Sequence, residues 1–314
     1  MLALAGCGGG SRPRVAATTT TATPVTTPTA TSTTATNAPA PPPPRPRPKP
    51  HAPYPVGERV LSLFDAARGR RLVTIVYYPN AHGPFPLIVF GHGFAVTPAP
   101  YTALLRAWAR AGYVVAAPVF PLGNADAPGG PNERDLVHQP RDMSFVITRL
   151  AALGAARSGF LAGRVDPRKV AVSGQSDGGD TALAVASDPR YQDPRVGAAV
   201  ILSGAEIPFL SPTQFGSPSP PLLATQGTAD TINPPSFTYT FFNAAPAPKY
   251  LVTLVGAAHL PPYTDARPQL GVVERVSLAF LDYYLKGRSP ALRRMAAEAR
   301  VPGTAALRAD PPVR

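Results

Sequence analysis

Short apolar strands alternate with amphipathic helices over residues 56–290, and this alternation constrains the fold more than any other feature of the sequence. The clearest strand is the apolar run Pro86–Phe90, which is typical of a strand buried on both faces. A helix is predicted at 99–111, where large apolar residues recur three and four positions apart. Gly112 ends that helix, and the next apolar strand follows at 113–117. Repeated strand–helix–strand connections predict a mainly parallel sheet with helices on both faces, the α/β class.

The same patterns place the other elements of the domain. Two strands are predicted ahead of the apolar run and four after residue 168, with helices between and after them. The strands are expected at 60–64, 72–78, 169–173, 196–202, 221–226 and 250–255, and the helices around 143–150 and 270–285. No large cap domain is expected, because the connection at 203–220 is a loop rich in Pro and Ser.

Residues 1–55 differ from the rest of the chain in composition. They contain no Asp or Glu, are dominated by Thr, Ala and Pro, and end in the Pro-rich run 41–50. Such a segment buries too little apolar surface to offset the entropy of ordering, so residues 8–55 are predicted to form a disordered linker. The remaining 314 − 55 = 259 residues suit one domain at 56–290, followed by a basic tail at 291–314.

The net charge of +12 comes mostly from the two ends of the chain. Residues 1–55 carry five basic residues and no acidic ones, and residues 286–314 carry seven basic and two acidic ones. The part between them therefore has 30 − 12 = 18 basic and 18 − 2 = 16 acidic residues. Because the excess lies in the terminal segments, the charge argues against nucleic-acid binding and favours contact with anionic surfaces.

The turn after the fifth predicted strand carries the most informative motif. It consists of Gly174, Gln175, Ser176, Asp177 and Gly178 and continues into an Ala-rich helix, which is the context of a G-x-S-x-G nucleophile elbow. Side chains in place of the two glycines would collide with neighbouring backbone in so tight a turn. The turn raises the Ser176 hydroxyl above the sheet at a helix N-terminus, so Ser176 is the predicted nucleophile.

A serine hydroxyl needs a general base, and the chain has five histidines. His259 follows the last predicted strand, so it is expected at the same carboxyl edge of the sheet as Ser176 and is the predicted base. Of the others, His51 lies in the predicted linker and His82 in a loop that is expected to be exposed. His92 is expected to brace its own loop, and His138 lies at the start of a predicted helix. Asp230 follows the preceding strand and is the predicted third member, with Glu206 and Asp265 as rival carboxylates. The chain order Ser, Asp, His is that of α/β-hydrolases.

The loop after the third predicted strand is expected to help bind an oxyanion, which requires two N–H donors. It reads Gly91, His92, Gly93 and Phe94. Gly93 lets the chain turn close to the site, and Phe94 then offers its backbone N–H. The second predicted donor is the N–H of Asp177, directly after the nucleophile. The side chain of His92 is predicted to brace the loop.

These landmarks follow one another through the domain in the order of a known superfamily. The domain resembles an α/β-hydrolase of the dienelactone-hydrolase-like group, near serine esterases similar to platelet-activating-factor acetylhydrolase and bacterial polyester hydrolases. The resemblance rests on the loop at 91–93, the elbow, and the segments Gly227–Asp230 and Gly256–His259. It implies the α/β-hydrolase fold and a hydrolase that uses the triad predicted above.

The single cysteine of the chain lies close to the N-terminus. Residues 4–7, Leu-Ala-Gly-Cys, resemble the lipobox of bacterial lipoproteins, which implies that Cys7 is lipidated. Residues 1–7 then resemble the end of a signal segment, although the six residues before Cys7 are too few for a complete one. The resemblance predicts an extracytoplasmic protein whose membrane contact is the lipid anchor alone, with a secreted protein as the alternative.

The predicted reaction is hydrolysis of a carboxylic ester through an acyl-enzyme on Ser176. Without a cap domain the site is expected to be open, which suits a small-molecule, lipid or polymeric ester; Phe94, Phe209, Phe215 and Tyr263 are predicted to line its pocket. No cofactor or metal is predicted, because the sequence has no phosphate loop, dinucleotide fingerprint or Cys/His cluster. Two alternatives remain: an amidase or peptidase with the same triad, and a non-catalytic binding lipoprotein at the cell surface.

Overall fold

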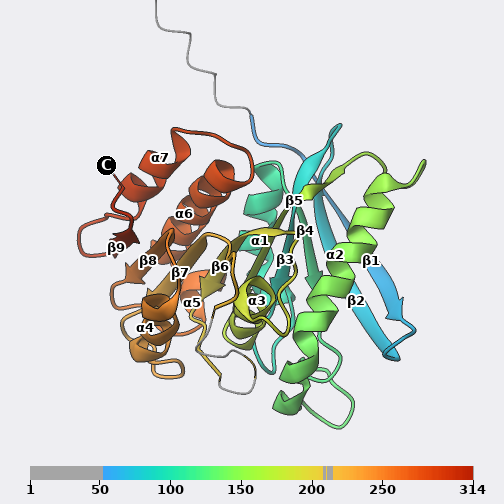
Figure 1. Cartoon of the computed structure of the whole chain (residues 1–314), viewed down its shortest axis with the longest axis horizontal. Helices are drawn as coiled ribbons and strands as arrows, with labels where there is room; N and C mark the ends of the chain where they lie inside the picture. The colour runs from blue at the N-terminus through green and yellow to red at the C-terminus, as the bar shows by residue number, and fades with distance from the viewer. Residues whose placement is uncertain (1–51, 208–209, 211–214, 314) are drawn as a thin grey trace, which may run out of the picture. The chain divides into compact units, whose positions relative to one another are not determined.

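A computed structural model describes residues 52–207, 210 and 215–313 of the chain (Figure 1). Cys7, the predicted signal segment at 1–7 and nearly all of the predicted linker at 8–55 lie outside these residues. The strands are β1 (Val56–Asp65), β2 (Arg70–Pro79), β3 (Phe85–Gly91), β4 (Val114–Pro118), β5 (Val165–Gln175), β6 (Val196–Leu202), β7 (Leu222–Gly227), β8 (Lys249–Leu254) and β9 (Ala305–Asp310). The α-helices are α1 (Thr102–Arg110), α2 (Gln139–Ala155), α3 (Asp177–Ser187), α4 (Pro235–Ala244), α5 (Pro261–Thr264), α6 (Gln269–Tyr284) and α7 (Ala291–Glu298), with 3₁₀ turns η1 (Ala99–Tyr101) and η2 (Glu133–His138).

The strands form one sheet in the order β1-β2-β4-β3-β5-β6-β7-β8-β9. β3 to β8 run parallel to one another, and β1, β2 and β9 are antiparallel to their neighbours at the two sides of the sheet. This confirms the prediction of a mainly parallel sheet. Because six strands point the same way, their carboxyl ends meet at one edge, where ligands of such sheets bind.

Helices cover both faces of the sheet (Figure 1), and the apolar runs explain why. Ile88 and Phe90 of β3 belong to one apolar core with α1 and α6, whereas Leu87 and Val89 belong to a second core with α2, α3 and α4. Successive side chains of a strand point to opposite faces, so a continuous apolar run is the pattern that a sheet covered on both faces needs. Each helix then buries one apolar stripe against its face of the sheet.

The C-terminal segment differs from the predicted basic tail. α7 packs against α6, and β9 pairs antiparallel with β8 as the last strand of the sheet. β9 consists of three alanines with one Leu, one Arg and one Asp and has no β-branched or aromatic side chain, so the sequence carried little strand signal there. The described domain therefore extends beyond residue 290 to Asp310. Three basic residues of the predicted tail lie on folded elements, Arg293 and Arg294 on α7 and Arg308 on β9.

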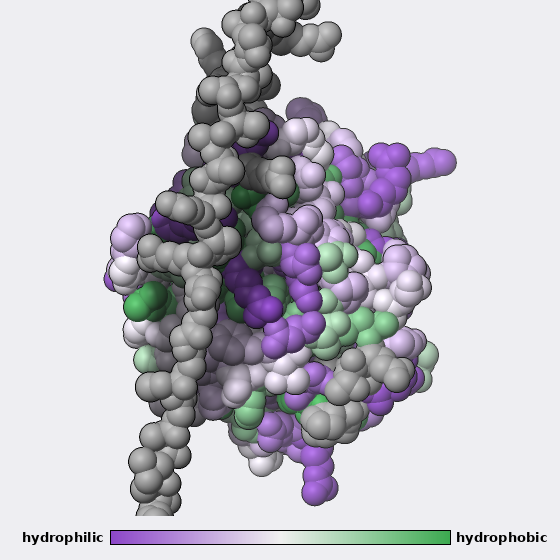
Figure 2. All heavy atoms as spheres, turned by 60° about the vertical axis from the view of Figure 1, so that its left-hand side comes forward, coloured by the Kyte–Doolittle hydropathy of each residue, from purple (hydrophilic) through white to green (hydrophobic). Residues whose placement is uncertain are grey.

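The surface on the side of α7, β9 and α4 mixes hydrophilic side chains with scattered apolar ones (Figure 2). α4, which sequence patterns did not predict, follows β7 and precedes β8 along the chain. It buries Phe241 and Phe242. None of the helices in the described part of the chain is long and apolar enough to span a membrane.

Candidate active site

Ser176 sits on a strained turn between β5 and α3. Its backbone has φ 55° and ψ −128°, a conformation that side-chain-bearing residues rarely adopt. A Cβ at position 174 would lie 2.0 Å from the carbonyl oxygen of Gly178, and a Cβ at position 178 would lie 2.1 Å from that of Gly91. The predicted collisions are therefore present, and the glycines are what allow the turn to hold Ser176 at the carboxyl edge, where it is the N-cap residue of α3.

His259 and Asp230 meet at the same edge, one after β8 and the other after β7. Nδ1 of His259 lies 2.8 Å from Oδ2 of Asp230. Oδ1 of Asp230 accepts the backbone N–H groups of Ile232 and Asn233 at 3.0 and 2.9 Å. Burial acts to raise the pKa of Asp230, but the hydrogen bond from His259 and those from Asn233 and Gln226 outweigh it and hold the pKa below its usual value. The carboxylate thus stays ionised and fixes the proton of the imidazole on Nδ1.

The rival groups lie apart from this pair. Within the described residues neither Glu206 nor Asp265 forms a hydrogen bond with His259; Asp265 accepts one from Thr264 Oγ1 at 3.0 Å. His51 lies outside the described residues, His82 lies in an exposed turn, and His138 ends η2.

The other nitrogen of His259 faces Gln175. Nε2 of the imidazole lies 3.1 Å from the side-chain nitrogen of Gln175, which also donates to the His259 carbonyl oxygen at 3.2 Å. The Ser176 hydroxyl makes no hydrogen bond with any described residue, although the residues on both sides of it, Gln175 and Asp177, interact with His259. His259 is therefore hydrogen-bonded both to Asp230 and to Gln175, the residue before Ser176, which brings the predicted base and its carboxylate next to the elbow.

The loop after β3 has the predicted brace. Nδ1 of the buried His92 lies 2.8 Å from the Gly93 carbonyl oxygen, and Nε2 accepts the Phe120 N–H at 3.0 Å. Burial lowers the pKa of His92 to about 4, so the ring is neutral and donates from Nδ1 while it accepts at Nε2. The N–H of Phe94 has no hydrogen-bond acceptor among the described residues, as an oxyanion donor requires.

Asp177 brings a carboxylate as well as an N–H to the site, and the elbow motif predicted a role only for the N–H. Its side chain is buried, and Oδ2 has no hydrogen-bond partner in the described part of the chain. Burial, followed by the negative charge of Glu133, raises the pKa of Asp177 to about 6, against the opposing effects of His259 and of the backbone N–H of Asp177 itself. An acid of this kind next to a nucleophile is typical of a functional site.

The predicted pocket residues do not gather around Ser176. Tyr263 is fully buried, and its hydroxyl lies 2.8 Å from Ser203 Oγ and 3.2 Å from Thr225 Oγ1. It therefore ties the helix after His259 to the ends of β6 and β7 and does not line an open pocket. Phe94 is 38% exposed beside the site, and Phe209 lies outside the described residues.

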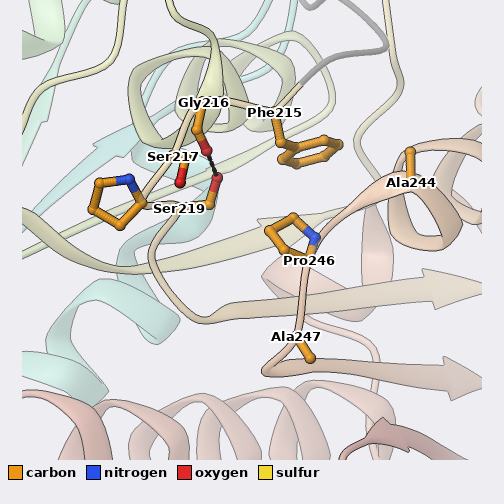
Figure 3. Close-up of a pocket in the computed structure, with 8 residues that line it drawn as sticks. Phe215, Gly216, Ser217, Ser219, Ala244, Pro246 and Ala247 are labelled. Carbon is orange, nitrogen blue, oxygen red and sulfur yellow. Dashed lines mark hydrogen bonds between the residues drawn. The ribbon is translucent and has the colours of Figure 1, made fainter.

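Phe215 lies at the opposite edge of the sheet. It lines a pocket with residues 216–219 and with Ala244, Pro246 and Ala247, just before the starts of β7 and β8 (Figure 3). The reason is topological: the connection from β6 must return from the carboxyl edge to the amino edge before β7 can run parallel to β6. The second half of that loop is thus carried away from Ser176. The Gly216 N–H donates to the carbonyl of Ser187, the last residue of α3, which fixes this position.

Gln175, Tyr101 and Gln226 support the site. The elbow motif already included Gln175, whereas sequence patterns gave Tyr101 and Gln226 no role there. Tyr101 fits the apolar face of the predicted helix, but its hydroxyl donates to Gln175 Oε1 at 2.7 Å. Gln226 donates to Asp230 Oδ2 at 3.2 Å. Across the described residues no group of three His, Cys, Asp or Glu side chains is placed to hold a metal ion.

Comparison with known proteins agrees with this architecture. The chlorophyllase family model matches residues 65–200, which include the oxyanion loop and the elbow but end before Asp230 and His259. No curated protein matches the sequence. A chlorophyllase match implies an ester hydrolase of the α/β-hydrolase superfamily, and the order and direction of the strands agree with that fold. The chain has the α/β-hydrolase fold, and residues 65–200 are similar to the chlorophyllases.

Proposed function

We propose that the protein is a serine hydrolase that cleaves carboxylic esters through an acyl-enzyme on Ser176. The observation that carries the proposal is the convergence at one sheet edge of a serine on a strained turn, a His259–Asp230 pair at 2.8 Å whose carboxylate is buried, and a Phe94 N–H with no acceptor among the described residues. These are the nucleophile, base, orienting carboxylate and oxyanion donor of acyl transfer. The match to an ester-hydrolase family supports the choice of esters.

The proposed reaction has two steps. The Ser176 oxygen attacks the ester carbonyl carbon while its proton moves to His259 Nε2, and the N–H groups of Phe94 and Asp177 stabilise the negative charge on the carbonyl oxygen. His259 then gives the proton to the leaving alcohol. Water, deprotonated by the same nitrogen, then attacks the acyl carbon. The bond from that carbon to the Ser176 oxygen breaks, His259 returns the proton to this oxygen, and the acid is released. Asp230 keeps the imidazole oriented and stabilises its positive charge.

The test is hydrolysis of p-nitrophenyl acetate, butyrate and octanoate by the full chain beside Ser176→Ala. We expect kcat to fall by a factor on the order of 10⁴ or more in the variant, because removing the nucleophile of a triad leaves only binding and oxyanion stabilisation. The stability of the variant should stay near that of the wild type. Chlorophyll, after which the matched family is named, is a further substrate for the panel.

Equal rates in both proteins would show that Ser176 is not the nucleophile. Turnover of p-nitroanilides at rates above those of the esters would favour the amidase alternative. Binding of envelope lipids or polymers without turnover of any substrate would favour the non-catalytic alternative.

We also propose that the domain is extracytoplasmic and tethered by a lipid on Cys7. This rests on the lipobox resemblance and on the Thr- and Pro-rich segment after it. Incorporation of labelled palmitate into the protein expressed in a bacterial host, and its loss in Cys7→Ser, tests the proposal. Release of an unlabelled protein into the medium would instead support secretion.

A further inference from the structure

Gln175 occupies an unusual place next to the predicted nucleophile. It is the last residue of β5 and only 1% exposed, and all its side-chain polar atoms have partners. The nitrogen faces two acceptors of His259, Nε2 at 3.1 Å and the carbonyl oxygen at 3.2 Å. The oxygen faces a donor, the Tyr101 hydroxyl, at 2.7 Å. The two ends of the amide therefore have different partners, and only this orientation satisfies all of them.

Tyr101 continues the chain of hydrogen bonds to the oxyanion loop. Its ring is fully buried, with the centroid 4.9 Å from that of Phe90. Its hydroxyl accepts the N–H of Gly93 at 3.4 Å, one residue before the predicted donor Phe94. A Cβ at position 93 would lie 2.9 Å from Gln175 Oε1, so this loop rests directly on the glutamine.

The contacts form one connected path through the site: Asp230, His259, Gln175, Tyr101 and Gly93. We propose that Gln175 is a positioning residue that holds the His259 imidazole and couples it, through Tyr101, to the loop that presents the Phe94 N–H. This inference rests on the proposed function. It assigns a role in the reaction to two side chains that touch neither the ester nor the proton in transit.

The same hydrogen bonds show which group contacts His259 Nε2 before it accepts the Ser176 proton. Because Nδ1 of His259 donates to Asp230, the only lone pair of the ring is on Nε2, and in this structure it faces the Gln175 amide. During attack that lone pair must accept the Ser176 proton. The second N–H of Gln175 can stay on the His259 carbonyl oxygen while Nε2 changes partner, so the base keeps its position. Misplacement of a catalytic group by about 1 Å lowers the rate about 100-fold, which gives the scale of what such a brace contributes.

The first test uses Gln175→Met and Tyr101→Phe. Gln175→Met keeps the volume and removes both donors, so we expect kcat to fall about 10- to 100-fold while KM changes by less than about 3-fold. Tyr101→Phe removes one hydroxyl and should lower kcat by a smaller factor. The double variant should lose less than the product of the two single factors, because both side chains act through one path.

Gln192→Met is the matched control. Gln192 also donates from its side-chain nitrogen to two acceptors, the carbonyls of Ala186 and Pro218, but at the amino edge of the sheet. Its loss should leave kcat and KM unchanged. If Gln175→Met also leaves kcat unchanged, or raises KM alone, the positioning role is wrong.

Gln175→Glu separates positioning from a purely structural role. A carboxylate next to Nε2 favours the protonated imidazole, so the acidic limb of the kcat/KM profile should move to higher pH. A residue that only fills space would lower the whole profile without moving it, and that result would overturn the proposal.

A spectroscopic readout keeps the inference testable if no ester is turned over. In ¹⁵N-labelled protein, the Nε2 resonance of His259 should move in Gln175→Met and stay in place in Gln192→Met, because only the first removes its hydrogen-bond donor. An unchanged resonance in both would show that the path is absent. A moved resonance without esterase activity would instead keep the path and reject the proposed function.

Discussion

Two buried polar clusters in this domain differ in how completely their charged and polar groups are paired. The first joins Arg70 of β2 to Asp135 and Asp142 beneath η2 and α2: Arg70 lies 2.8 Å from Asp135, and Arg68 lies 2.7 Å from Asp142. Burial acts to lower the pKa of Arg70, but the hydrogen bonds and charges of the two carboxylates outweigh it and raise the pKa. In this cluster each buried carboxylate faces a guanidinium.

The second cluster is the candidate active site, and its groups are left partly unpaired. Oδ2 of Asp177 has no hydrogen-bond partner among the described residues, the Ser176 hydroxyl has none, and the Ser176 backbone is strained. Removing one partner of a buried ion pair lowers stability because the other charge is left uncompensated. Unpaired buried polar groups and backbone strain already lower stability, and they persist where they serve chemistry. The comparison predicts that changes in the first cluster lower stability, whereas changes in the second lower the reaction rate or, at an unpaired buried group, raise stability.

Among the variants that test this comparison, Asp230→Asn should give the largest effect, which is a loss of kcat. The amide can hold the imidazole in the wrong tautomer, with the proton on Nε2, so we expect kcat to fall by a factor on the order of 10³–10⁴. The free energy of unfolding should change by much less than the activation free energy that corresponds to this loss of kcat. Steady-state kinetics with p-nitrophenyl butyrate and urea unfolding measure the two quantities. A variant that is inactive because it is unfolded would remove the contrast between the clusters.

Asp142→Ala, in the first cluster, should lower stability and leave kcat nearly unchanged. Its side chain is fully buried against Arg68 and Arg70, and removing one partner of such a group leaves buried charge uncompensated. We expect a loss of about 3 kcal/mol in the free energy of unfolding, with kcat per folded molecule within about 2-fold of the wild type. The control is Glu58→Ala, which breaks the exposed pair with Arg106 and should change stability by less than about 1 kcal/mol. A large fall in kcat at full folding would contradict the separation.

Asp177→Asn should change stability only above about pH 4, so its effect depends on pH. The pKa of Asp177 is raised from 3.8 to about 6, so between these values the folded state binds more protons than the unfolded state. Stability therefore falls as pH rises through this window, and above it the ionised group lowers the free energy of unfolding by a quantity on the order of 3 kcal/mol. The variant should match the wild type near pH 4 and be the more stable protein at pH 8. Urea unfolding at the two pH values checks this, and an equal difference at both would contradict it.

Residues close together in the sequence allowed firm predictions. The elbow could be predicted because Gly174 and Gly178 are needed within a few residues of Ser176, and their clashes are local. His92 could be assigned as a brace because it belongs to the loop that it supports. Strand β9 and helix α7 were expected as a tail, since their pattern is weak and their stability comes from packing against β8 and α6.

Contacts between distant segments could not be predicted. The Tyr101–Gln175 bond joins residues 74 positions apart, and the Gln175–His259 contact joins residues 84 apart. Apolar spacing predicted that Tyr101 is buried and gave no information on what its hydroxyl reaches. Likewise Phe215 and Tyr263 were aromatic residues near the predicted site in sequence, but the path of one loop and the burial of one ring place both outside the pocket.

The sequence alone predicted the strands β1 to β8, the elbow and the positions of Ser176, Asp230 and His259 at strand ends. It did so because strand periodicity and the parallel rule bring all these ends to one edge. Tertiary packing determines which side chain faces His259 Nε2, which buried carboxylate oxygens lack a hydrogen-bond partner and which aromatic rings are buried. Those outcomes depend on directions and distances of a few ångströms between segments, and apolar periodicity carries no information on that scale.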